Sequence, residues 1–218
     1  MRIKICGITN AEDGRLASSL GADAVGLNFY PPSPRSVREE QAALIVQSLP
    51  PFVTPVALFV NESWESMARI LDRLRFIKTV QWHGERHEPI PASWPYRVIA
   101  AFAVRSADSL LQVREYLGRC EKAGRLPDAL LLDGHAPGVY GGTGQPAPWK
   151  LLADFQAQVP IILAGGLTPD NVAQAVSIVK PWAVDVASGV ESSPGKKDAD
   201  KMRRFITAAR EARLLDLL

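Results

Sequence analysis

The sequence predicts a single (β/α)8 barrel, and three observations lead to that prediction. The chain has 218 residues, and barrels of this class often run to about 200–250 residues as one domain. Short apolar runs alternate along the whole chain with segments of helical period. Glycines and polar residues gather just after the runs and not before them, which is the end at which such barrels place their sites. No linker or low-complexity stretch interrupts residues 1–218, so one domain is expected.

Eight runs are interpreted as strands, because most are continuous apolar stretches of the kind found in parallel strands covered on both faces. In chain order they are Ile3–Cys6, Ala24–Phe29, Thr54–Phe59, Thr79–Trp82, Val98–Phe102, Ala129–Asp133, Ile161–Ala164 and Ala183–Val186. Strict alternation with crossovers implies a parallel sheet, and eight strands can close into a barrel. A doubly wound open sheet is the alternative. It is disfavoured because no G-x-G-x-x-G follows the first run.

The segments between the strands carry apolar residues at helical spacing. Three such faces are Met67, Ile70, Leu71 and Leu74; Leu110, Val113 and Leu117; and Met202, Phe205, Ile206 and Ala209. Ser106 or Asp108 is expected to open one helix, and Thr168 is expected to cap another with Pro169 at its first position. The stretch Glu85–Trp94 has two prolines and no helical stripe, which predicts a short or irregular connection after strand four.

Composition and charge narrow the class of partner. The formal net charge is +2, which is too small to favour nucleic acid or an acidic membrane. No apolar segment is long enough for a signal peptide or a membrane span. The low cysteine count, Cys6 and Cys120, is typical of a reducing compartment, so we expect a cytoplasmic location. The apolar tail Leu214–Leu218 docks on its own barrel or on a partner subunit, so a monomer and a homodimer both remain open.

Glycine-rich segments follow the last three predicted strands. Gly141–Gly144 follows the sixth strand, Gly165 and Gly166 follow the seventh, and Ser188 and Gly189 take the matching place after the eighth. The loops after strands seven and eight of this fold often bind phosphate. Glycine lets backbone N–H groups approach an anion closely, and the repetition favours a phosphate site over simple tight turns. The phosphate-binding residues we predict are Gly142, Gly144, Gly165, Gly166, Ser188 and Gly189.

Two groups with acid–base chemistry are predicted to face the barrel mouth. Alternation places Lys4 and Cys6 on one face of the first strand and the isoleucines on the other, so Cys6 is expected to point inward. Cys6 is a small core residue or a functional base, and its position alone does not decide. Asp133 shares its parity with Leu131, and we favour a general acid or base over a loop cap. Lys4 lies deeper and needs a partner, for which we expect Asp185.

Two further residues after strand ends are candidates for substrate contact. Arg35 lies in a loop stiffened by three prolines, and a rigid guanidinium there could bind a carboxylate bidentately, although loop arginines are commonly solvated. His83 follows the fourth strand and is a hydrogen-bonded structural residue or a ligand contact, with neither favoured. The sequence shows no metal-ligand cluster, so we expect no metal.

Eight segments, taken in order, resemble the phosphoribosylanthranilate isomerase family. They are Lys4–Thr9, Ser33–Arg35, Val80–Gly84, Leu132–Asp133, Gly141–Gly144, Ala164–Leu167, Asp185–Glu191 and Pro194–Asp198. Each segment is weak alone, but the ordered set runs from residue 4 to about residue 198 and is highly specific. Two departures stand out. Trp82 replaces a usual leucine, which we expect to alter packing at the barrel mouth. Pro148 replaces a frequent aspartate, which we expect to affect the start of a helix.

The resemblance implies a reaction and a set of roles. The family converts N-(5-phosphoribosyl)anthranilate into 1-(2-carboxyphenylamino)-1-deoxyribulose 5-phosphate, an Amadori rearrangement in L-tryptophan biosynthesis that uses no cofactor or metal. Asp133 would be the general acid that protonates the ring oxygen, and Cys6 the base that removes the C2′ proton. Arg35 would hold the anthranilate carboxylate, with His83 also at the substrate, and the glycine loops would bind the phosphate.

Two alternatives remain. The related sugar-phosphate isomerase of histidine biosynthesis runs the same chemistry with a pair of aspartates, and Cys6 at the first position argues against it. A non-catalytic phosphate-binding barrel would keep the glycine loops and could lose the acid and the base. The presence of both Cys6 and Asp133 disfavours that alternative.

Overall fold

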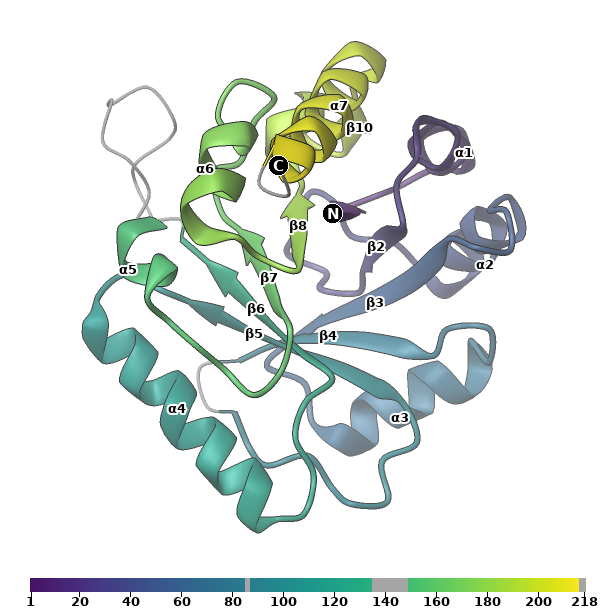
Figure 1. Ribbon diagram of the computed structural model, residues 1–218. Helices are drawn as coiled ribbons and strands as arrows, with labels where there is room; N and C mark the ends of the chain where they lie inside the picture. The colour runs from purple at the N-terminus through teal and green to yellow at the C-terminus, as the bar shows by residue number, and fades with distance from the viewer. Residues whose placement is uncertain (85–86, 135–148, 216–218) are drawn as a thin grey trace.

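Eight parallel strands close into a barrel in the computed structural model, which describes residues 1–84, 87–134 and 149–215, with side chains in the last helix as far as Ala212 (Figure 1). Each strand pairs with the next along the chain, and the last pairs with the first. The strands are β1 Arg2–Cys6, β2 Ala24–Asn28, β3 Thr54–Val60, β4 Thr79–His83, β5 Arg97–Ala103, β6 Ala129–Asp133, β7 Ile161–Ala164 and β8 Ala183–Val186. The predicted barrel is confirmed, and strand boundaries differ from the prediction by one residue at most.

Helices follow most of the strands and surround the barrel (Figure 1). They are α1 Ala11–Leu20, α2 Glu39–Gln47, α3 Trp64–Arg73, α4 Ala107–Lys122, α5 Trp149–Ala153, α6 Val172–Val179 and α7 Ala199–Leu215. A short 3-10 helix, η1 Ser188–Val190, follows β8. The irregular connection predicted after β4 is confirmed, because the described residues between β4 and β5 contain no helix. Among the described residues, no helix combines the length and apolar character needed to cross a membrane.

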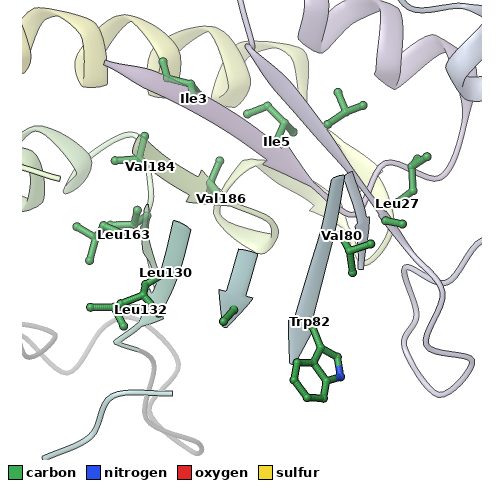
Figure 2. Close-up of a cluster of buried hydrophobic side chains, with 14 of the residues drawn as sticks. Ile3, Ile5, Leu27, Val80, Trp82, Leu130, Leu132, Leu163, Val184 and Val186 are labelled. Carbon is green, nitrogen blue, oxygen red and sulfur yellow. The ribbon is translucent and has the colours of Figure 1, made fainter. Parts of the chain in front are cut away.

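The strand side chains divide into two buried layers, as alternation requires. The outward layer packs against the helices and includes Ile3, Ile5, Leu27, Val80, Trp82, Leu130, Leu132, Leu163, Val184 and Val186 (Figure 2). A second cluster fills the barrel interior and consists of Val56, Ile99, Ala101, Ala129, Leu131, Ile162, Ala164 and Ala183. Lys4, Cys6 and Asp133 have the parity of this inner cluster, so the predicted inward orientation of these three residues is confirmed.

Three sequence-based expectations need correction. Helix α6 begins at Val172 with Asn171 as its N-cap residue, so Thr168 does not cap it and Pro169 is not its first residue. The Asn171 side chain instead accepts a hydrogen bond from the Thr168 N–H (2.8 Å) and donates one to the Gly166 carbonyl (2.9 Å), which closes a turn ahead of the helix. Trp82 points outward, against Trp64, and does not pack at the barrel mouth.

A short hairpin between η1 and α7 was not predicted. Its strands are β9 Glu191–Ser193 and β10 Lys196–Lys197, and both fall below the length at which periodicity can be recognised. Gly195 has φ +80° in the turn between them, a conformation that glycine adopts without strain. The Thr9 hydroxyl donates to the Gly195 carbonyl (2.6 Å), so the hairpin is held against the segment that follows β1.

Polar residues at the N-terminal end of the barrel form a repeated structural device. Asp23 accepts from Arg2 (3.0 Å) and from the Ile3 N–H (2.9 Å). Asp128 accepts a hydrogen bond from the Arg97 side chain (3.1 Å) and one from the Val98 N–H (2.9 Å). Each carboxylate therefore joins the start of one strand to the residue that precedes the next strand. These pairs border a cavity of about 520 Å³ that opens at this end of the barrel.

Candidate active site

Lys4 and Asp185 form a buried ion pair inside the barrel. Their strands β1 and β8 are neighbours, and the two residues are register partners. The Lys4 Nζ donates to Asp185 Oδ1 over 2.8 Å, and both side chains are less than a tenth exposed. This confirms the ion pair expected from the sequence. Burial alone would lower the pKa of Lys4, but the neighbouring Asp185 carboxylate and the Cys6 sulfur raise it, so Lys4 remains protonated.

The Cys6 thiol lies next to this ion pair, over a strand position that has no side chain. A Cβ placed on Gly26 would lie 2.6 Å from Cys6 Sγ and 3.2 Å from Lys4 Nζ. The sulfur and the ammonium therefore converge on the space above Gly26, where the ammonium lies close enough to the sulfur to lower its pKa. Glycine at this position is required by the close approach of β1 and not by backbone dihedral freedom.

Opposing influences act on the pKa of Cys6. Burial of the thiol is the largest and raises the pKa above its ordinary value. The Lys4 ammonium lowers it, the Asp185 carboxylate raises it, and the Lys197 ammonium lowers it. The net direction is upward, so the thiol form predominates near neutral pH.

Arg35 is joined to Glu191 by a bidentate ion pair. Arg35 Nε and Nη2 donate to the two Glu191 carboxylate oxygens over 2.8 and 2.6 Å. Lys197 Nζ donates to the same carboxylate over 2.8 Å and to the Ala187 carbonyl over 3.1 Å. The Lys197 side chain is fully buried, and the Glu191 side chain nearly so. Sequence reasoning missed Glu191 and Lys197 as members of the site, although both fall within segments that carry the family resemblance.

This network holds Arg35 close to the start of the loop after β1. The Arg35 side chain covers Gly7, whose φ of +72° requires a residue without a Cβ. The two Arg35 donors committed to Glu191 leave Nη1 and one Nη2 hydrogen available for another acceptor. On its other side the network reaches α1, because Asp13 accepts a hydrogen bond from the Lys197 N–H over 3.0 Å.

Asp133 lines a cavity of about 280 Å³ at the C-terminal end of the barrel. The same cavity is lined by Asp185, and by Gly165, Gly166, Ser188 and Gly189 from the loops after β7 and β8. The structure thus brings the predicted acid together with four of the six predicted phosphate-binding residues. Gly142 and Gly144, the other two, lie outside the described residues, as does Pro148. Cys6, Arg35 and His83 do not line this cavity as it stands in the described part of the chain.

The loops after β7 and β8 pack directly against each other. Gly165 and Gly166 have φ values of +93° and +63°, so the first of these loops needs glycine at both positions. A Cβ on Gly189 would overlap the backbone carbonyl oxygen of Leu167. Contact at the level of backbone atoms places the glycines of both loops along one cavity, and glycine-rich loops of this kind bind phosphate oxygens in other proteins.

His83 ends β4 inside the mouth and is held by a neighbouring side chain. Its Nε2 lies 2.6 Å from Gln81 Nε2, which is consistent with a neutral ring that accepts a hydrogen bond. Burial is the main cause that lowers the pKa of His83 to about 4, with Lys4 contributing. A neutral His83 can donate or accept a hydrogen bond but carries no charge at neutral pH.

The arrangement places acid–base groups beside glycine-rich loops, and the described residues hold no recognised metal centre. Within residues 1–84, 87–134 and 149–215, no group of three or more His, Cys, Asp or Glu side chains could hold a metal ion. A thiol and a carboxylate at one barrel mouth, beside glycine loops, are equipped to move protons on a small phosphorylated molecule.

Comparison with known proteins identifies molecules that are similar to this one in sequence and fold. The family model described as N-(5′-phosphoribosyl)anthranilate isomerase matches residues 3–208. The protein of that name from Geobacter sulfurreducens is 47% identical over 210 residues, which cover 96% of this chain and 98% of the relative. Its counterpart from Trichlorobacter lovleyi is 45% identical over 214 residues and covers 97% of this chain and 99% of its own.

Solved structures agree with the sequence relatives. The phosphoribosyl anthranilate isomerase of Thermotoga maritima superposes with a TM-score of 0.83 at 38% identity, covering 97% of this chain and 99% of that one. A further structure contains the isomerase in complex with reduced 1-(o-carboxyphenylamino)-1-deoxyribulose 5-phosphate. It superposes with a TM-score of 0.79 at 36% identity, with the same coverage of both chains.

Proposed function

This chain belongs to the N-(5′-phosphoribosyl)anthranilate isomerase family, and from that premise we propose that Cys6 and Asp133 are the base and the acid of its reaction. The activity is an aldose-to-ketose isomerisation in tryptophan biosynthesis. Its substrate is a small phosphorylated molecule, which agrees in size with the glycine-lined cavity of about 280 Å³. The inward orientation of both side chains at one barrel mouth is the observation that carries the proposal.

Asp133 begins the reaction by giving its proton to the furanose ring oxygen. The ring C–O bond then breaks, and the electron pair on the anthranilate nitrogen forms the C=N bond of a Schiff base. Cys6, as the thiolate, removes the proton at C2′. The electron pair of that C–H bond moves into the C=C bond of an enolamine, while the π electrons of the C=N bond return to the nitrogen. Tautomerisation of the enolamine gives the ketone. The proton gained by sulfur and the proton lost by Asp133 balance, so the step needs no redox partner.

Arg35 and the glycine loops hold the two ends of the substrate. Arg35 keeps Nη1 donors beyond its pair with Glu191, and these donors bind the anthranilate carboxylate. The loops at Gly165, Gly166, Ser188 and Gly189 bind the phosphate through backbone N–H groups. His83 contacts the substrate as a neutral hydrogen-bonding group. Anchoring both ends orients the sugar between the acid and the base.

Single substitutions test the assignment of the acid and the base. Cys6→Ala and Asp133→Asn should each reduce kcat by at least a hundredfold, because general acid or base catalysis contributes about 10²–10⁴-fold. Binding of the reduced product analogue, measured by calorimetry, should change little. Cys120→Ala is the matched control, since Cys120 is also a buried free thiol, and it should retain activity. Full turnover in Cys6→Ala or Asp133→Asn would refute the role given to that residue.

The same preparation tests the rival activity. Turnover of the anthranilate substrate should exceed turnover of the corresponding histidine-pathway sugar phosphate, and activity on the latter alone would overturn the reaction assigned here. The chain works as one domain of residues 1–218, and its two free thiols are consistent with the reducing cytoplasm.

We further propose that the chain forms a homodimer through the N-terminal end of the barrel. Phe52 is almost fully exposed, and Trp182 is half exposed. Both border the 520 Å³ cavity at that end. A projecting aromatic side chain beside a cavity on one face is self-complementary, because a two-fold axis places each Phe52 in the cavity of the other subunit. A solved Thermotoga maritima relative, 34% identical with a TM-score of 0.79, is described as monomers of a dimeric isomerase.

Sedimentation equilibrium of Phe52→Glu tests the homodimer. The unmodified chain should sediment as a dimer at micromolar concentration, and Phe52→Glu should sediment as a monomer with unchanged circular dichroism. Leu44→Glu is the control, because Leu44 is also exposed but lies on α2, outside the cavity lining. A monomeric unmodified chain, or a dimeric Phe52→Glu, would contradict this interface.

A further inference from the structure

We propose that Lys4, held in place by Asp185, is a positioning residue that stabilises the thiolate of Cys6 and so sets the pH at which the base becomes active. The proposal rests on the assignment of Cys6 as the base. It adds to that assignment a specific cation, a specific anion and opposite expected effects for their removal.

The first step is geometric. Lys4 and Cys6 are two residues apart on β1, so their side chains leave the strand on the same face. The side chains then meet over Gly26 of the neighbouring strand. A Cβ placed on Gly26 would lie 2.6 Å from the Cys6 sulfur and 3.2 Å from the Lys4 ammonium nitrogen. Asp185, the register partner of Lys4 on β8, fixes the ammonium from the other side through the 2.8 Å hydrogen bond.

The second step is the balance of charge around the sulfur. The cations that act on Cys6 are Lys4 from β1, Lys197 from β10 and Arg35 from the segment after β2. The facing anions are Asp185 from β8 and Glu191 from β9, which neutralise two of these cations. Neutral His83 ends β4, and Asp133 ends β6 at the same mouth. Leaving out Asp133 and Asp13, whose carboxylate binds the Lys197 N–H on the far side of the network, these three cations and two anions carry one excess positive charge while Cys6 is a thiol. A thiolate at Cys6 cancels that charge.

The third step distinguishes Lys4 from the other two cations. Arg35 and Lys197 share the single Glu191 carboxylate, whose hydrogen bonds fix the orientation of both side chains. Lys4 has one carboxylate partner, and its Nζ also converges with the Cys6 sulfur over Gly26. The Lys4 ammonium interacts with both the Asp185 carboxylate and the Cys6 sulfur, so each substitution changes the pKa of Cys6. Removing the carboxylate leaves the ammonium paired with the thiolate alone, which lowers that pKa. Removing the ammonium leaves the sulfur beside an unpaired carboxylate, which raises it.

The experiment measures the protonation of Cys6 directly. Cysteine labelled with ¹³C at Cβ is incorporated into a Cys120→Ala background, so that Cys6 is the single labelled residue, and its chemical shift is followed from pH 6 to pH 11. Asp185→Asn should move the titration midpoint downward by about one pH unit or more, and Lys4→Gln should move it upward by a similar amount, because a charge within 4–6 Å shifts a pKa by about 1–3 units. The pH at which log kcat/KM levels off should move in the same directions.

Asp23→Asn is the matched control. Asp23 is also a carboxylate paired with a basic residue of β1, but it lies at the opposite end of the barrel. Its replacement should leave the Cys6 midpoint unchanged. The double variant Lys4→Gln with Asp185→Asn removes both charges without leaving either buried alone, and it serves if one of the single variants fails to fold. Its midpoint should fall between those of the two single variants.

The outcomes separate this proposal from the assignment of the base. If Cys6→Ala is inactive but neither Asp185→Asn nor Lys4→Gln moves the Cys6 midpoint, the base assignment stands and the role of Lys4 is refuted. If Cys6→Ala is fully active while the midpoints shift as expected, Lys4 tunes a thiol that is not the base, and the catalytic proposal fails. Midpoints that move in the same direction for both single variants also overturn the proposal.

Discussion

Replacing Glu191 by glutamine should destabilise the protein by several kcal/mol, although the change alters one atom in a residue that lies outside the barrel strands. Glu191 receives hydrogen bonds from Arg35 and from Lys197, and the Lys197 side chain has no solvent exposure. A glutamine can accept with one oxygen only, and its NH₂ group would face one of the two cations. The change therefore leaves a buried ammonium or guanidinium without its counterion.

The magnitude follows from the burial of this network. Breaking a buried ion pair by removing one partner costs about 3–5 kcal/mol. At roughly 2–4 °C per kcal/mol for a chain of this size, the melting temperature should fall by about 6–20 °C. The hydrogen bonds from Arg35 and Lys197 hold the pKa of Glu191 below its ordinary value despite burial of the carboxyl group, so its contribution is present above about pH 4.5. That contribution is lost as the pH falls through the lowered folded-state pKa, and the difference between the two proteins should shrink there.

Urea unfolding of Glu191→Gln, beside Glu39→Gln, measures the effect. Glu39 forms the same bidentate arrangement with Arg73, but on the surface. Exposed pairs contribute about 0–1 kcal/mol, so Glu39→Gln should cost less than about 1 kcal/mol. Glu191→Gln should also raise KM, since a glutamine cannot accept both Arg35 hydrogen bonds and therefore holds the guanidinium less firmly in one orientation. Equal losses of stability in the two variants would show that burial of the network is not what stabilises it.

Three further perturbations test other contacts of the site. Gly189→Ala should raise KM by at least tenfold with a smaller effect on kcat, because its methyl group would push the loop of Leu167 away from the phosphate; steady-state kinetics with unchanged KM would contradict this. Gly26→Ala should lower kcat/KM by at least tenfold, since the new Cβ would lie 2.6 Å from Cys6 Sγ; normal kinetics would show that the sulfur can move without loss of activity. The free energy of unfolding should rise with pH between about 4 and 6.5, because His83 has a pKa of about 4 when folded and near 6.5 when unfolded. In His83→Gln this rise should be smaller by about 2–3 kcal/mol. Urea titrations across that pH range measure the difference, and an equal rise in both proteins would contradict it.

The barrel and its inward-facing residues could be predicted because both depend on short-range pattern. Alternation along β1 determines that Lys4 and Cys6 share a face, and closure of eight strands makes β1 and β8 neighbours. Those two facts together predict the pairing of Lys4 with Asp185 across 181 positions of sequence. Because the closed barrel fixes which strands are adjacent, a contact between residues far apart in the sequence can be predicted from alternation on two neighbouring strands.

The hydrogen bonds made by loop residues could not be predicted in the same way. Which residue caps α6 depends on whether Thr168 or Asn171 bonds across the turn, and both residue types suit either position. The pairing of Arg35 with Glu191 depends on how a hairpin of two- and three-residue strands folds back over the barrel. A partial signal was present, because Glu191 and Lys197 are charged residues within segments that carry the family resemblance.

The mouth of this barrel contains more buried charge than stability requires. A buried ion pair is often neutral or unfavourable compared with well-packed apolar residues of similar volume, and the inward-facing strand side chains include a large apolar cluster. The pairs of Lys4 with Asp185 and of Lys197 with Glu191 therefore have a cost that packing does not explain. Both lysines lower the pKa of the same thiol, which burial raises. The charges at the mouth are best understood as the means by which a buried sulfur remains able to lose its proton.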